Sequence, residues 1–187
     1  EIRMVSVSSG AIYDATQTMP LKEDSPAITE GSPYALSKIA MEQAMKAYVK
    51  KGLDIVIARP FNHTGPGQLA GFLIPDLYEQ IQNALLNNVP LSIGNLKTKR
   101  DYTDVRDVVQ AYILLATAEK KLLSGYTYNV CSGKSVAGTR ILELIANACG
   151  VSNIKRIIDP EKLRPNDALD VFGSYNKIHS ELGWKPT

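Results

Sequence analysis

The segment LDIVIARPF (53–61) is apolar along almost its whole length. A strand buried on both faces of a parallel sheet has this pattern, whereas a strand with one solvated face alternates between apolar and polar residues. Such a strand needs neighbouring strands at its sides and helices on both faces. The segment therefore predicts an α/β layered fold.

The rest of the chain supplies further strands and helices in alternation. Short β-rich runs predict strands at 2–9, 126–131 and 155–159. The helical patterns fall at 34–51, 74–88, 104–119, 139–149 and 174–182, with loops at 13–33 and 62–71. Ser32 is expected to cap the first helix, Pro33 to occupy its first turn and Gly52 to end it.

The composition excludes several classes of protein. The 187 residues carry a net charge of +2 and no run of basic residues, which argues against nucleic-acid binding. No apolar run is long enough to span a bilayer, and the first residues do not form a signal-peptide pattern. Cys131 and Cys149 lie far apart, without redox or metal-ligand spacing. We therefore expect a cytoplasmic protein with both cysteines reduced and buried, and no metal site.

Tyr34 and Lys38 stand four residues apart in the expected first helix, so their side chains share one face. An ammonium group beside a phenol favours the phenolate form. Such a tyrosine can exchange a proton with a carbonyl or an alcohol near neutral pH. The alternative is a surface pair without chemistry, because both residue types are common.

Two further features fall at the expected carboxyl edge of the same sheet. Ser9 ends the first strand, and RPFNHTGPGQ (59–68) begins at the end of the 53–61 strand. Ligands bind open α/β sheets at this edge, where Ser9 could donate a hydrogen bond to the same carbonyl oxygen as Tyr34. Each feature alone is compatible with a polar turn, but three at one edge favour a catalytic site.

Ser9, the Tyr34-x-x-x-Lys38 motif and the RPFN loop together resemble the extended short-chain dehydrogenase/reductase family of sugar-nucleotide epimerases, dehydratases and reductases. The resemblance covers essentially the whole chain. Three segments look most like the GDP-4-keto-6-deoxy-D-mannose reductases of this family: RPFNHTGPGQ (59–68), GNLKTKRDYTDVRDVVQAY (94–112) and LRPND (163–167).

The resemblance implies the C-terminal part of a Rossmann fold, a parallel doubly wound sheet, plus a small α/β substrate-binding domain. Residues 1–60 would belong to the Rossmann part. Residues 61–187 would form mainly the substrate-binding region, with 98–131 partly returning to the Rossmann sheet. A homodimer through the Tyr34 helix is also implied, with close packing permitted by Ala40, Ala44 and Ala47.

The resemblance also implies roles in catalysis and cofactor binding. Ser9 and Tyr34 would hold the substrate carbonyl, and Tyr34 would protonate it. Lys38 would bind the nicotinamide ribose and favour the Tyr34 phenolate. The nicotinamide pocket, for NADP or NAD, would be lined by Pro60, Phe61, Asn62 and His63.

Five residues would bind a nucleotide-sugar substrate, with a GDP-linked sugar favoured. Asn62 would reach the diphosphate, and Arg100 and Arg164 would clamp it, as suits forked cations. Phe72 and Leu73 would lie against the nucleotide base. Either arginine, taken alone, is equally compatible with a solvated surface position.

Ala11 limits the reaction. In the dehydratases of this family a carboxylate stands two positions after the catalytic Ser or Thr, and in the epimerase-reductases a cysteine stands there; a methyl group does neither task. We therefore expect NAD(P)H-dependent reduction of the C4 ketone of GDP-4-keto-6-deoxy-D-mannose to GDP-D-rhamnose or its C4 epimer. The alternative is a sugar-nucleotide C4 epimerase or a 4,6-dehydratase of the same family.

The family's G-x-x-G-x-x-G loop, which binds the dinucleotide pyrophosphate, does not occur in this sequence. The residue that selects NAD or NADP is missing with it, so the cofactor preference stays open. We expect the chain to correspond to the C-terminal part of such an enzyme, present as a fragment, with a partner chain or in a self-associated form. A further alternative is a non-catalytic fragment that keeps the fold.

Overall fold

A three-stranded parallel sheet forms the base of the fold in the computed structural model, which describes residues 2–151, 154–163 and 167–187. Its strands are β1 (Met4–Val7), β2 (Ile55–Pro60) and β7 (Thr127–Val130), in the order β1-β2-β7. Every β2 residue is buried, as the apolar run predicts. Because β1 and β7 both pair with β2 in parallel, all three carboxyl ends lie at one edge.

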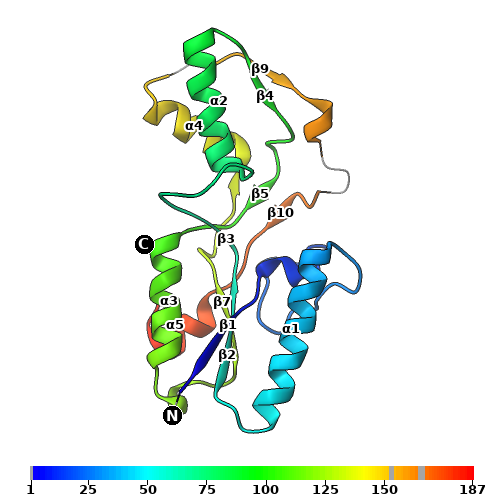
Figure 1. The fold of residues 1–187 in the computed structure, drawn as a ribbon, viewed down its shortest axis with the longest axis vertical. Coiled ribbons are helices and arrows are strands. Elements are labelled where there is room, and N and C mark those ends of the chain that lie inside the picture. Colours follow the sequence, from blue (N-terminus) through cyan, green and yellow to red (C-terminus); the bar gives the residue numbers. More distant parts are fainter. Residues whose placement is uncertain (1, 152–153, 164–166) are drawn as a thin grey trace.

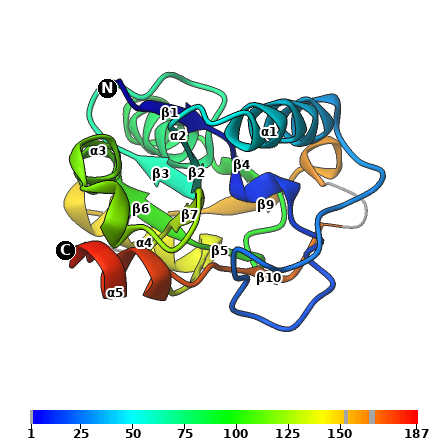
Figure 2. The same ribbon diagram turned by 90° about the horizontal axis from the view of Figure 1, so that it is seen from below.

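Helices cover both faces of this sheet (Figure 1). α1 (Pro33–Lys50) lies on one side of the strands, and α3 (Val105–Thr117) and α5 (Asn176–Leu182) lie on the other (Figure 2). The core between the sheet and α3 and α5 contains Val56, Ala58, Val108, Ala111, Leu115, Tyr128, Val130, Ile178 and Trp184. This doubly covered parallel sheet confirms the predicted α/β fold class.

A second group of elements, here called the distal region, lies at the other end of the long axis (Figure 1). It contains α2 (Leu73–Asn87), α4 (Gly138–Ala148) and the parallel strands β4 (Leu91–Ile93) and β9 (Arg156–Ile158). Its core consists of Leu77, Ile81, Leu91, Ile93, Leu96, Ile141 and Leu142. The sheet and the distal region therefore each have a hydrophobic core of their own.

Short strands connect the sheet to the distal region. β3 (Asn62–Thr64) follows β2 and pairs in parallel with β6 (Tyr102–Asp104). β5 (Lys99–Arg100) pairs with β8 (Val136–Ala137) and β10 (Asp170–Val171). Segments from widely separated parts of the sequence thus meet midway along the molecule (Figure 1).

The long elements agree with the sequence predictions. Each predicted helix is present with nearly the predicted ends. The Ser32 side chain caps α1 by accepting a hydrogen bond from the Ala35 N–H at 3.2 Å, Pro33 occupies the first turn, and Gly52 follows the helix with φ of +94°. The predicted loop over 62–71 is wrong at its start, because pairing with β6 makes Asn62–Thr64 a strand.

The cysteines differ from each other in burial. Both are unpaired, and Cys131 is buried as expected, but Cys149 is only half-buried. The prediction of a buried Cys149 is wrong because this residue lies at the C-terminal end of α4, where the helix reaches the surface. Within the part of the chain that the structure describes, no helix combines the length and apolar character needed to cross a bilayer.

Asp101 holds the connecting strands together. It lies between β5 and β6, is 1% exposed, and accepts hydrogen bonds from the backbone N–H groups of Ser132 at 2.7 Å, Gly133 at 3.0 Å and Gly173 at 3.2 Å. Burial raises the pKa of Asp101, although these hydrogen bonds oppose the shift. One carboxylate thus joins three segments: the β5–β6 junction, the turn after β7 and the residues after β10.

Asp101→Ala should therefore destabilise the protein. The substitution leaves three buried backbone N–H donors without their acceptor, and a buried unsatisfied donor costs about 1–3 kcal/mol. We expect the free energy of unfolding in urea to fall by about 2–5 kcal/mol. The exposed Asp24→Ala variant is the control and should stay within about 0.5 kcal/mol of the original protein. Equal midpoints for the two variants would contradict the role of Asp101.

Candidate active site

A cleft of about 1200 Å³ lies between the carboxyl edge of the sheet and the distal region. Ser9 and Tyr34 line it from the sheet side, and Leu77 and Ile93 line it from the distal side. It collects nearly all the site residues predicted from the sequence: Ser9, Tyr34, Pro60, Phe61, Asn62, His63, Phe72, Leu73 and Arg100. Lys38 is not among the lining residues, and Arg164 lies outside the described residues. The cleft sits where open parallel sheets bind their ligands.

The Ser9 turn and the start of α1 form one wall. Ser9 follows β1 and caps a 3₁₀ turn, Gly10–Ile12, by accepting a hydrogen bond from the Ala11 N–H at 3.1 Å. Tyr34 lies in the first turn of α1 with its side chain 53% exposed. Ser9 caps its 3₁₀ turn and Tyr34 lies in the first turn of α1, and both residues lie at the same wall of the cleft.

Lys38 anchors α1 to β1. Its ammonium group donates a hydrogen bond to the carbonyl oxygen of Val7 at 2.9 Å, and its Nζ lies 5.7 Å from the centroid of the Tyr34 ring. Val7 is the last residue of β1, two positions before Ser9. The predicted Tyr34–Lys38 pair thus shares a helix face and lies beside the strand end that leads to Ser9.

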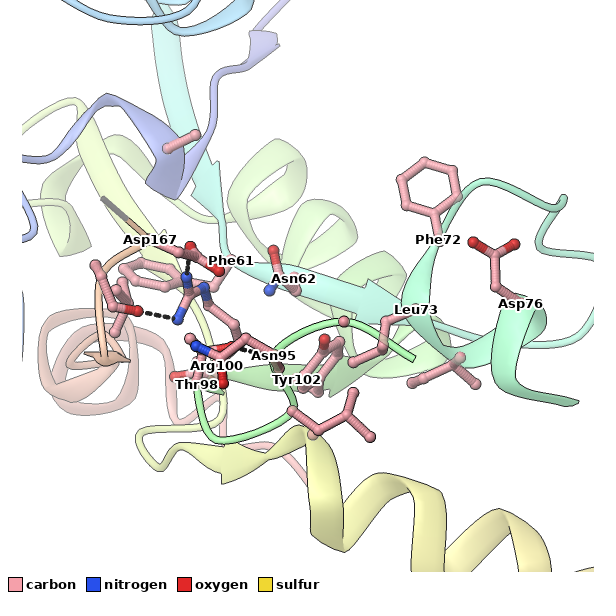
Figure 3. A pocket seen from close by; sticks show the side chains of 18 of the residues that line it. Phe61, Asn62, Phe72, Leu73, Asp76, Asn95, Thr98, Arg100, Tyr102 and Asp167 are labelled. Atoms are coloured by element: carbon pink, nitrogen blue, oxygen red, sulfur yellow. Dashed lines mark hydrogen bonds and ion pairs between the residues drawn. The ribbon is translucent and has the colours of Figure 1, made fainter. Parts of the chain in front are cut away.

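The segment after β2 enters the cleft. Asn62 is exposed there (Figure 3), and His63 Nδ1 lies 3.0 Å from the carbonyl oxygen of Phe61. Phe61 is 8% exposed and its ring stacks on Tyr13 with centroids 6.0 Å apart. A Cβ atom added to Gly173 would lie only 2.6 Å from this ring, so glycine is required for the close approach. Phe61 therefore lines the cleft, but most of its ring is buried in the hydrophobic core.

Arg100 presents a guanidinium group that is already partly bonded. Its Nη1 donates to the carbonyl oxygens of Lys99 and Ala168, each at 2.7 Å, and its Nη2 forms an ion pair with Asp167 (Figure 3). The side chain is fixed by these contacts instead of extending freely into solvent. A bound anion would share this cation with Asp167.

The far end of the cleft lies at the start of α2. Phe72 is 58% exposed and precedes the helix, Leu73 begins it, and Asp76 lies in the first turn (Figure 3). Asp76 Oδ1 accepts a hydrogen bond from the Gly71 N–H at 2.7 Å. The start of α2 therefore contributes an aromatic ring, an aliphatic side chain and a carboxylate to the lining of this end.

Among the cleft residues that sequence reasoning missed are Asp76, Asp167 and Tyr102. Asp76 was missed because an acidic residue in the first turn of a helix usually stabilises the helix dipole and indicates no ligand. Asp167 is the last residue of the LRPND segment, and its place in this segment could have identified it as a site residue. Burial raises the pKa of Tyr102, although the charge of Arg100 opposes the shift.

Comparison with known proteins decides the family. The family model described as GDP-mannose 4,6 dehydratase matches residues 1–187. The chain belongs to this family. GDP-6-deoxy-D-mannose reductase of Pseudomonas aeruginosa is 34% identical over 185 residues, which cover 96% of this chain and 59% of the relative. A dTDP-glucose 4,6-dehydratase of an Actinoplanes species is 29% identical over 187 residues, covering 98% of this chain and 55% of the relative.

Solved structures of the family have the same fold. The Pseudomonas aeruginosa protein RMD, solved in complex with NADPH, superposes with a TM-score of 0.86 at 34% identity, covering 99% of this chain and 61% of that one. A UDP-N-acetylglucosamine 4-epimerase from Methanobrevibacter ruminantium gives a TM-score of 0.81 at 28% identity, with 99% and 57% coverage. The chain thus spans little more than half the length of the relatives it matches. The expected family and fold are confirmed, whereas the domain boundary near residue 60 and the roles of the site residues stay predictions.

Proposed function

We propose that the protein reduces the C4 ketone of a nucleotide-linked 6-deoxyhexose, with GDP-4-keto-6-deoxy-D-mannose as the substrate and GDP-D-rhamnose as the product. The observation that carries the proposal is the pair of hydroxyl groups, Ser9 and Tyr34, at one wall of the cleft with the methyl group of Ala11 beside them. This wall can hold and protonate a carbonyl oxygen. Elimination of water also needs a base near the sugar ring, and Ala11 does not provide one. The identity to the Pseudomonas aeruginosa reductase supports the same choice.

The chain's own residues would bind the ketone and supply its proton. Ser9 would donate a hydrogen bond to the carbonyl oxygen, and Tyr34 would donate the proton that converts this oxygen to a hydroxyl group. Bound NADPH or NADH would supply the hydride that carbon C4 receives. Lys38 lies one helical turn from Tyr34, with its Nζ 5.7 Å from the centroid of the Tyr34 ring. One hydride and one proton together balance the reduction.

The residues at the sheet edge fit the nicotinamide half of such a cofactor. Lys38 has donor capacity beyond its hydrogen bond to Val7, because an ammonium group carries three N–H bonds. A ribose hydroxyl is a suitable acceptor for one of them. Around the ring itself we assign Pro60, Phe61, Asn62 and His63, which follow one another along the cleft.

The substrate would extend from the sheet edge towards the distal region. We assign the diphosphate to Asn62 and Arg100, together with Arg164, and the base to Phe72 and Leu73. Arg100 supports this assignment because its guanidinium group is held at the cleft by the carbonyl oxygens of Lys99 and Ala168. A fixed, forked cation suits a diphosphate better than a mobile one.

Three alternatives carry different expectations. Relatives of this chain include 4-epimerases and dehydratases as well as reductases. An epimerase would retain its cofactor with no net consumption, and a dehydratase would need an acid and a base that Ala11 does not supply. A non-catalytic fragment would not bind dinucleotide, which is compatible with the absence of the glycine loop from the sequence.

We also propose that the protein is cytoplasmic and pairs with a second copy through α1. Ala40, Ala44 and Ala47 are exposed on this helix, and small side chains permit two helices to approach closely. The unpaired cysteines are compatible with a reducing compartment.

Cofactor consumption with GDP-4-keto-6-deoxy-D-mannose tests the reaction. The assay uses NADPH and NADH in turn, with the protein expressed from the full open reading frame that encodes this chain. Tyr34→Phe should leave the fold intact and lower turnover by about a hundredfold or more, because the proton donor is lost. Tyr48→Phe is the matched control, since Tyr48 is 47% exposed on the same helix, and it should have full activity.

The possible outcomes separate the alternatives. Near-normal turnover in Tyr34→Phe would remove Tyr34 from the mechanism. No consumption of either cofactor by the original protein would remove the GDP-sugar reductase assignment. A dinucleotide titration of the same protein then distinguishes a non-catalytic protein, which should not bind, from an enzyme with another substrate, which should.

Arg100→Ala should mainly raise KM. If the guanidinium group binds the substrate diphosphate in the ground state and the transition state alike, its loss weakens binding with little change in kcat. We expect KM to rise about tenfold or more, because charged hydrogen bonds contribute about 1.5–3 kcal/mol each. The control Arg140→Ala removes an exposed arginine of α4 that pairs with Glu143. Unchanged KM in Arg100→Ala would place the diphosphate elsewhere.

The position of Asp76 supports the proposal that the nucleotide base of the substrate is guanine. A carboxylate can accept hydrogen bonds from both guanine N1–H and the guanine amino group. Uracil and thymine present one N–H between two carbonyl oxygens, so the same carboxylate would face at least one acceptor. Because Asp76 lies beside Phe72 at the far end of the cleft, it would favour GDP-linked over UDP-linked or dTDP-linked sugars.

Asp76→Asn should therefore weaken binding of GDP but not of UDP. Asparagine keeps an oxygen for the Gly71 N–H and replaces the second oxygen with a donor that opposes guanine. We expect the Kd for GDP, measured by calorimetry, to rise about tenfold, or about 1.4 kcal/mol. Glu79→Gln makes the same charge change at an exposed position of α2 and is the control. A parallel loss of GDP and UDP binding would argue against base recognition by Asp76.

A further inference from the structure

A buried ion pair lies beneath the active-site wall. The Arg59 guanidinium and the Glu42 carboxylate form two parallel hydrogen bonds, Nε to Oε1 at 2.8 Å and Nη2 to Oε2 at 2.7 Å. Their side chains are 6% and 3% exposed. This geometry is the bidentate form that fixes two side chains in relative orientation as well as in distance.

The Arg59 guanidinium group also has other hydrogen-bond partners. Its Nη1 donates to the Tyr13 hydroxyl oxygen at 2.7 Å and to the carbonyl oxygen of Glu23 at 2.9 Å. The Tyr13 hydroxyl in turn donates to Asn129 Oδ1 at 2.6 Å. The guanidinium group also lies 4.9 Å from the centroid of the Tyr13 ring. One arginine of β2 therefore bonds to α1, to the loop after Ser9 and, through Tyr13, to β7.

The protonation states are those of a charged pair. Burial raises the pKa of Glu42, but the Arg59 hydrogen bonds and charge outweigh it, so the pKa falls below its usual value. Burial lowers the pKa of Arg59, but Glu42 and Tyr13 outweigh it. Burial also raises the pKa of Tyr13, despite the opposing charge of Arg59, so its hydroxyl keeps the proton that it donates to Asn129.

The residues Arg59, Glu42 and Tyr13 lie on the same elements as the proposed catalytic groups. Tyr34, Lys38 and Glu42 follow at four-residue steps on one face of α1. Tyr13 ends the turn that Ser9 begins, and Arg59 directly precedes Pro60. The Arg59 guanidinium thus joins the helix of Tyr34, the turn of Ser9 and the strand that leads to the expected nicotinamide pocket.

Stability alone does not account for this arrangement. Removing two charges from water is costly, and a buried ion pair can often be replaced by apolar residues of similar volume without loss of stability. A bidentate pair differs from an apolar contact in direction, because its hydrogen bonds fix both rotation and translation. Such a contact is useful where the position of a helix relative to a strand must be constant.

We propose that the Glu42–Arg59 pair, with Tyr13, is a positioning device that holds α1 against β2 and the Ser9 turn and so sets the distance between the Tyr34 and Ser9 hydroxyl groups. Glu42, Arg59 and Tyr13 act through Ser9 and Tyr34 and do not themselves react. The role in turnover rests on the proposed function, whereas the role in holding α1 does not.

The test is Arg59→Lys in the protein expressed from its full open reading frame. Lysine keeps a cation opposite Glu42, so no buried charge is left unpaired, but it loses the fork that fixes direction. We expect kcat for the ketone reduction to fall about tenfold or more, because small misplacements of reacting groups cost rate. KM should stay within about twofold, because the substrate contacts are unchanged.

Arg3→Lys is the matched control. Arg3 also forms an ion pair, with its Nε 3.0 Å from Oδ1 of Asp54, the residue before β2, and with side chains 7% and 19% exposed, but it lies before β1 at the end of the strands away from the cleft. Both variants should lower the melting temperature, and Arg3→Lys should keep its kcat within about twofold. A normal kcat in Arg59→Lys, or an equal loss of kcat in both variants, would overturn the proposal.

Hydrogen exchange gives a readout that needs no substrate. In Arg59→Lys, the backbone amides of the first turns of α1 should exchange faster than in the original protein, because α1 is held less firmly. In Arg3→Lys they should exchange at the original rate. Equal exchange in the two variants would overturn the proposal even if the reductase assignment is correct. Faster exchange in Arg59→Lys alone would support it even if the assignment fails.

Discussion

The burial of β2 on both faces is the constraint on which the rest of the structure depends. All of its side chains are removed from solvent, so each face must be covered by helices, and both edges are paired with parallel strands. Parallel strands cannot be joined by tight turns, and the chain must cross the sheet through helices to return. The alternation of strands and helices follows from this requirement.

The same constraint accounts for the position of the cleft. Because β1, β2 and β7 run in one direction, the segments that follow them all leave the sheet at one edge. Ser9, the residues after Pro60 and the turn after Val130 are therefore brought together from distant parts of the sequence. The distal region stands over this edge, so the cleft between the two is bounded by polar loops on one side and α2 on the other.

A strand buried on both faces leaves no solvated position for a charged side chain. Arg59 is nevertheless part of β2, and its charge is compensated by Glu42 on the covering helix. These two buried charges lie in the layer between α1 and the sheet, next to the candidate site. By contrast, the core shared by β2, α3 and α5 is a cluster of buried hydrophobic residues.

The sequence was sufficient for the long elements, and most of the site residues predicted from it line the cleft. Continuous apolar runs identify buried strands, and the signals at Ser32 and Gly52 locate the ends of α1. It was insufficient for β5, β8 and β10, because two-residue strands arise from tertiary pairing and carry no periodicity. Glu42 was equally hidden, since a glutamate in a helix usually indicates a solvated face.

The separation of the two hydrophobic cores has a consequence for evolution. The buried residues of the distal core and of the sheet core form distinct sets among the described residues. Substitutions at sites without shared contacts change folding free energy nearly additively. Changes in α2 and its neighbours can therefore accumulate with little effect on the stability of the sheet core. Such a division permits divergence at the nucleotide end of the cleft, and the relatives of this chain are named for GDP-, dTDP- and UDP-linked sugars.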